Sequence, residues 1–162
     1  MEALSAAILS AAAVLEGSSL GATMRGGRGV YPAVNVAHVA GLVLLVGGIL
    51  VVDLRTVGLG RAIPLAPLSR LVTPLAVAGL LLLAGSGFLL FAADAGPLVR
   101  SAVFQAKLAL IAAALVNALL FRRLFGDFAD GRQPPMLART MAVLSIGLWL
   151  VAGALGRLIA YT

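Results

Sequence analysis

Three ionisable side chains interrupt long apolar stretches of this sequence, and they are the first candidates for chemistry. His38, Lys107 and Arg157 each lie in a run that otherwise lacks charged residues. An ionisable group inside lipid is costly, so such a residue usually binds something or faces a polar partner. These three positions therefore predict a functional site within a membrane.

The spacing of these residues places them at a similar depth. If two of the runs begin at Tyr31 and Arg100, His38 and Lys107 each lie seven residues inside a helix. At 1.5 Å per residue both are roughly 10 Å below the same boundary. We therefore expect one polar cluster in the outer half of a helical bundle. Its predicted members are Asn35, His38, Gln105, Lys107 and Arg157, with Glu16 as a lid or counter-ion and Asn117 deeper on the helix of Lys107.

A lone histidine beside two cations favours particular ligands. Histidine is the commonest metal ligand and also an axial ligand of haem. Haem b suits this cluster, because its propionates would meet Lys107 and Arg157, whereas a bare ion such as copper would be repelled by the cations. Haem b or copper is thus the expected cofactor, with His38 as the ligand.

Two other interpretations use the same residues. The polar side chains can serve as interhelical hydrogen bonds and snorkelling groups in a structural or assembly subunit of a membrane complex or homo-oligomer. Alternatively, His38, Lys107 and Asn117 can belong to a small proton-linked carrier. The sequence has no nucleophile elbow, paired carboxylates, HExxH, Walker loop or dinucleotide fingerprint, so no motif points to an enzyme.

Four apolar stretches must position these residues. Of the 162 residues, 62% are hydrophobic and 11% are charged, which is too little polar surface for a soluble domain. A transmembrane helix needs about 20 apolar residues. The predicted fold is an all-α, integral membrane four-helix transmembrane bundle formed by residues 29–162. Its spans are expected at about 31–52, 71–93, 100–122 and 138–160.

The ends of these spans carry further expectations. Asp53 and Arg55 follow the first span, where we expect them to cap or pair as a structural boundary pair. All prolines, Pro74 included, are expected in loops or near helix starts. Residues 1–28 are predicted to form an amphipathic interfacial helix and a glycine-rich break, with a signal peptide or a fifth crossing as alternatives.

The charge distribution indicates the partner and the orientation. The net charge is +6, but the basic residues are scattered at the ends of apolar runs, so we expect membrane lipid and no nucleic acid as a partner. The two loops that follow the first and third spans hold seven arginines, against three on the opposite side. This bias predicts that these loops are cytoplasmic and that both termini are outside.

Short motifs in the first three spans resemble those of a known family. The motifs are YP at 31–32, HVAG at 38–41, DLR at 53–55, GLG at 58–60, FQAK at 104–107 and NA at 117–118. Over roughly residues 15–125 the chain resembles a bacterial family of small membrane proteins without an assigned function, and more loosely the copper-resistance D (CopD-like) membrane proteins. The resemblance implies a four-helix bundle in the bacterial inner membrane and copper or haem handling. It also implies that His38, Asp53, Arg55, Lys107 and Asn117 are the recurring polar positions.

Overall fold

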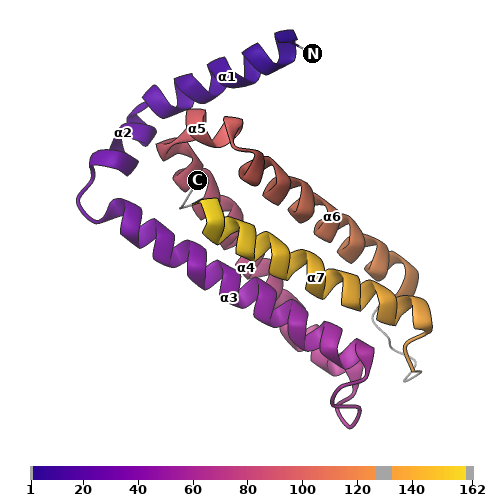
Figure 1. Cartoon of the computed structure of the whole chain (residues 1–162). Coiled ribbons are helices and arrows are strands. Elements are labelled where there is room, and N and C mark those ends of the chain that lie inside the picture. Colours follow the sequence, from indigo (N-terminus) through magenta and orange to yellow (C-terminus); the bar gives the residue numbers. More distant parts are fainter. Residues whose placement is uncertain (1, 127–132, 160–162) are drawn as a thin grey trace.

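The structure is a computed structural model that describes residues 2–126 and 133–159. Within these residues the chain forms helices and no strands (Figure 1). In chain order the helices are α1 (Glu2–Gly17), α2 (Ser19–Gly26), α3 (Val30–Val57), α4 (Leu65–Ala93), α5 (Ala95–Arg100), α6 (Ala102–Phe125) and α7 (Met136–Leu158).

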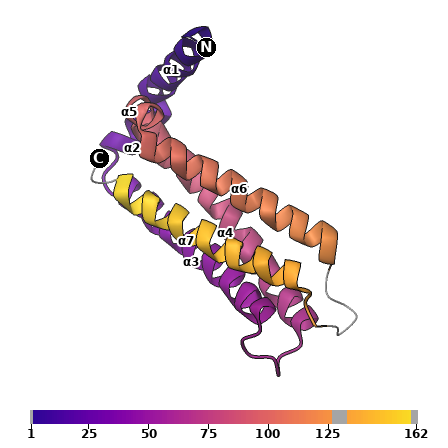
Figure 2. The same cartoon turned by 45° about the vertical axis from the view of Figure 1, so that its right-hand side comes forward.

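Helices α3, α4, α6 and α7 lie side by side as a four-helix bundle, which both views show (Figures 1 and 2). Helix α3 packs on α4 and on α7, and α6 packs on α7. All four are long and apolar enough to cross a membrane. Side chains such as Val36 (70% exposed) and Leu81 (68% exposed) cover the outside, where lipid can solvate them but water cannot do so favourably. The predicted all-α, multi-pass membrane bundle is confirmed.

Helix α3 is longer than the sequence pattern indicates. It continues beyond residue 52 to Val57, where Gly58 takes a positive φ of 124° and ends the helix. Asp53 and Arg55 therefore lie within the helix, in its last turns, and not after it.

Helix α4 also starts earlier than expected. It begins at Leu65 instead of about residue 71, because Pro67 is compatible with a first helical turn. Pro74, which we expected near a helix start, therefore lies inside the helix. Its missing N–H leaves a carbonyl group one turn earlier without the usual helical donor.

Helices α1, α2 and α5 form a collar over one end of the bundle, which we call the collar end (Figure 1). The predicted N-terminal helix is present, but it breaks at Ser18 with a bend of 58°, so that α1 and α2 together resemble a broken span or a re-entrant segment. Arg25 holds the collar together by donating to the carbonyl oxygens of Ala93 and Glu16, each at 2.8 Å. The opposite end of the bundle, with the connection 58–64, is called the loop end.

Glycines allow the bundle helices to approach closely at their centre. A Cβ atom at Gly79 of α4 would lie 2.5 Å from the backbone nitrogen of Leu45 in α3 and 2.8 Å from the carbonyl oxygen of Gly41. The core next to this crossing contains Leu45, Ala76, Ala114 and Trp149, one buried residue from each helix of the bundle. Gly41 and Gly79 therefore allow the backbones of α3 and α4 to pack closely.

Substitution at Gly79 tests this contact. Gly79→Ala should destabilise the bundle by about 1–3 kcal/mol, because backbone atoms of α3 must shift to admit the methyl group. Gly85→Ala is the matched control in the same helix, since a Cβ there meets nothing within 4 Å. Both variants gain the same helix propensity, so the difference in thermal unfolding in mild detergent reports the contact. Equal melting temperatures for the two variants would contradict the close approach of α3 and α4.

Candidate functional site

His38 of α3 is half-buried at the collar end of the bundle, and α4 orients its ring. Its Nδ1 lies 2.9 Å from the hydroxyl oxygen of Ser86. That hydroxyl lies 2.5 Å from the carbonyl oxygen of Leu82, to which only the hydroxyl can donate. The Ser86 oxygen must then accept from Nδ1–H, so the hydrogen-bond network assigns the proton of neutral His38 to Nδ1. The Nε2 atom keeps its lone pair and takes part in no hydrogen bond within the described chain.

Lys107 reaches the same region from α6. A Cβ atom added at Gly156 of α7 would lie 3.1 Å from the Nζ atom of Lys107. In the same way, a Cβ atom added at Gly87 of α4 would lie 3.2 Å from the Cε1 atom of His38. His38 and Lys107 are close enough to interact electrostatically. All four bundle helices therefore contribute to one region, in which two glycines make room for a histidine and a lysine. We call it the His38 site.

The other predicted members of the cluster are exposed or bonded to other groups. Asn35 and Arg157 are exposed, and the exposed Gln105 donates to the carbonyl oxygen of Val99 at 2.8 Å. Glu16 accepts from the backbone N–H of Gly96 at 2.8 Å, so it caps the short helix α5 and does not cover His38. The bend at Ser18 and the unpredicted helix α5 direct Glu16 away from the bundle interior.

The donor set distinguishes between possible metal ligands. Among the described residues there is no group of three or more His, Cys, Asp or Glu side chains that could hold a metal ion. A bare copper ion would need several such donors. Haem needs only an axial ligand from the protein, because its porphyrin supplies the remaining four nitrogens. The residues at the His38 site thus fit haem better than a bare ion.

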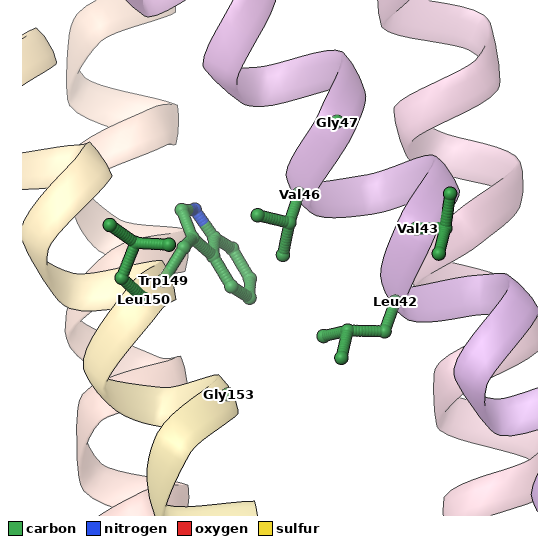
Figure 3. A pocket seen from close by; sticks show the side chains of 7 residues that line it. All are labelled: Leu42, Val43, Val46, Gly47, Trp149, Leu150 and Gly153. Carbon is green, nitrogen blue, oxygen red and sulfur yellow. The ribbon is translucent and has the colours of Figure 1, made fainter.

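An apolar groove of about 420 Å³ lies between α3 and α7 (Figure 3). The groove is lined by Leu42, Val43, Val46, Gly47, Trp149, Leu150 and Gly153. Its side chains contain one polar atom, the indole nitrogen of Trp149, which makes no hydrogen bond. Leu42 follows His38 by one turn of α3, and Gly153 precedes Gly156 by one turn of α7. The groove therefore adjoins the His38 site along both helices.

A second polar site at the loop end was not predicted from the sequence. Asp53 of α3 is only 7% exposed, and its carboxyl group lies within hydrogen-bonding reach of the Ser145 side chain of α7. Its Oδ2 atom is buried and has no hydrogen-bond partner. The carboxyl group borders a cavity of about 130 Å³. The polar residues that line this cavity, the Asp53 site, are Asp53, Ser69, Thr73, Asn117, Arg122 and Ser145, and they come from all four bundle helices.

Arg55 does not serve as the partner of Asp53. Its guanidinium donates to the carbonyl oxygens of Ile63, at 2.6 Å, and Arg61, at 3.2 Å, so it fastens the loop between α3 and α4. Two positions apart on a helix, Asp53 and Arg55 point in nearly opposite directions. The expected boundary pair is therefore not formed in the described chain. A helical projection of the sequence indicates that Asp53 points into the bundle, because His38 and Asp53 lie only about 60° apart around α3.

Comparison with protein-family models, with curated proteins and with solved structures found no significant match to this chain. The resemblance to CopD-like proteins consequently stays a prediction, and the function rests on the two sites inside the bundle.

The proton position on His38 can be tested directly, because the sequence contains a single histidine. Nitrogen-15 NMR of histidine-labelled protein in detergent should show the Nδ1–H tautomer, since Ser86 must accept. Ser86→Ala should populate the Nε2–H tautomer, whereas Ser10→Ala, an exposed serine that bonds only within α1, should leave the spectrum unchanged. A wild-type spectrum of the Nε2–H tautomer would contradict the assigned network.

Proposed function

We propose that this chain is a haem-binding membrane protein in which His38 is an axial ligand. One observation carries the proposal. Ser86 accepts from Nδ1–H and leaves the Nε2 lone pair of the half-buried His38 free for a ligand. Histidines that ligate metals commonly donate their other ring N–H to an oxygen in this way, which fixes the tautomer and raises the basicity of the ligand.

Two neighbouring features suit the rest of a haem group. The apolar groove between α3 and α7 offers aliphatic and aromatic surface to a macrocycle. Lys107 supplies a positive charge for a propionate group, which in a low-dielectric interior is a strong interaction. When bound, haem supplies one-electron redox chemistry, whose potential the axial ligand and its hydrogen bonds would tune.

The charge at the site favours haem over copper. Lys107 repels a bare cation next to His38, and the described chain offers no further cluster of donors to offset this repulsion. The same lysine attracts a ligand that combines a metal with carboxylate groups.

A visible absorption spectrum of the purified protein tests the proposal. With haem added during expression, the wild type in mild detergent should show a Soret band and sharp bands after reduction with dithionite. His38→Ala should lose them, because it removes the axial nitrogen. Asn35→Ala, an exposed position one turn away on the same helix, should keep them.

Haem binding by Lys107→Gln and by the wild type completes the test. The lysine variant should bind haem about tenfold more weakly, the cost of losing one hydrogen bond to a charged group. A colourless wild type that also binds no added haemin would overturn the proposal. The structural or assembly subunit would then be the preferred function, to be tested by co-purification of partners.

A further inference from the structure

The carboxyl group of Asp53 is buried, and the described residues leave one of its oxygens without a hydrogen bond. The side chain is 7% exposed, and among the described residues the Ser145 hydroxyl is the one side-chain group that hydrogen-bonds the carboxyl. An unpaired carboxylate in this setting costs several kcal/mol. A positive charge in the adjoining cavity would remove this cost.

The cavity is lined by oxygen donors of the kind that hard cations prefer. The hydroxyl oxygens of Ser69 and Thr73 lie 3.3 Å apart on α4. Asn117 of α6 uses its amide nitrogen to donate to the carbonyl oxygen of Met141 at 3.1 Å, and this leaves its amide oxygen available as an acceptor. Together with Asp53 and Ser145, these groups resemble the carboxylate, hydroxyl and carbonyl donors of alkali and alkaline-earth sites.

The charge count at the Asp53 site limits the ligand to one positive charge. Asp53 is the single acidic residue in the described lining, and the single basic one is Arg122, an exposed residue of α6 whose charge opposes a second cationic charge. No second titratable group faces the carboxyl from α4 or α7 among the described lining residues. A divalent cation would remain uncompensated, whereas a monovalent one matches the single charge of the Asp53 carboxylate.

The size and position of the cavity agree with a small ion. Its volume of about 130 Å³ corresponds to a few water molecules of about 30 Å³ each, which leaves room for an ion with part of its hydration shell. The cavity is lined by residues of all four bundle helices at the loop end.

We infer that the Asp53 site binds a small monovalent cation of the sodium class, held by the Asp53 carboxylate and the surrounding oxygen donors. This inference is independent of haem at His38, which lies about 22 Å away along α3 at 1.5 Å per residue. The two sites can therefore succeed or fail separately.

Binding of radioactive sodium to the full chain in lipid nanodiscs tests the inference. At pH 8 the wild type should bind sodium saturably, and thermal unfolding should shift upward with sodium chloride but not with N-methyl-glucamine chloride at equal ionic strength. Asp53→Asn should reduce sodium affinity at least tenfold and remove the shift. Asp94→Asn is the matched control, because Asp94 is an exposed carboxylate at the junction of α4 and α5.

A second variant tests the same site if Asp53→Asn fails to fold. Ser145→Ala removes one oxygen donor and keeps the carboxylate, and it should weaken sodium binding about fivefold while the protein stays monodisperse. Wild-type protein without saturable binding or a sodium-specific shift would overturn the inference, because the cavity would then hold water only. Stabilisation by acid alone, with no response to sodium, would also overturn it and would assign the site to a proton.

Discussion

A membrane interior offers no water to hydrogen-bond buried polar groups, and this constraint organises the polar chemistry of the bundle. Most polar side chains in the helices are satisfied by a nearby backbone carbonyl. Thr56 donates to Val52 one turn away, and Asn117 donates across the bundle to Met141. Such groups need nothing further. Other polar atoms in the bundle lack such a bond, and two of them matter for ligand binding. The Nε2 atom of His38 makes no hydrogen bond in the described chain, and the Oδ2 atom of Asp53 is buried without one. The two sites are defined by these atoms.

Helix packing determines where such exceptions can occur. Gly41 and Gly79 bring the backbones of α3 and α4 so close at mid-height that no side chain fits between them. The core residues Leu45 and Trp149 fill the same level. Polar groups are therefore displaced to the two ends of the bundle. At the collar end Gly87 and Gly156 leave space for His38 and Lys107, and at the loop end a cavity lined by all four bundle helices remains beside Asp53. Glycines thus have two roles: some allow close helix packing, and others leave room for the side chains of a site.

The sequence predicts the fold well because four apolar runs of sufficient length leave little choice of architecture. The proximity of His38 and Lys107 is predictable because each lies seven residues inside its span, which at 1.5 Å per residue places both at the same depth in the membrane. Other features depend on where a helix stops. Asp53 was assigned to a boundary because hydropathy falls there, yet α3 continues for another turn to Gly58, so the carboxyl stays inside. An N-terminal helix on the outer side of the bundle predicts Glu16 as a lid over the cluster, but the chain bends at Ser18 and Glu16 accepts from Gly96 of α5 instead. Periodicity within one helix cannot reveal contacts set by bends and by neighbouring helices.

The two sites have opposite electrostatic character, and this contrast constrains what each can hold. At the collar end the one full charge described beside neutral His38 is the ammonium group of Lys107, so a ligand there gains by carrying negative groups. At the loop end the one carboxylate in the described lining is buried among hydroxyl and amide groups, with the exposed Arg122 as the one basic residue, so a ligand there gains by carrying a single positive charge. A single metal ion with protein ligands would be repelled at the first site and, if divalent, incompletely neutralised at the second. A metal carried within an anionic macrocycle at His38 and a monovalent ion at Asp53 avoid both penalties. Since α3 supplies the principal residue of each site, the helix fixes their separation at about 22 Å, at 1.5 Å per residue, and the glycine crossing lies between them.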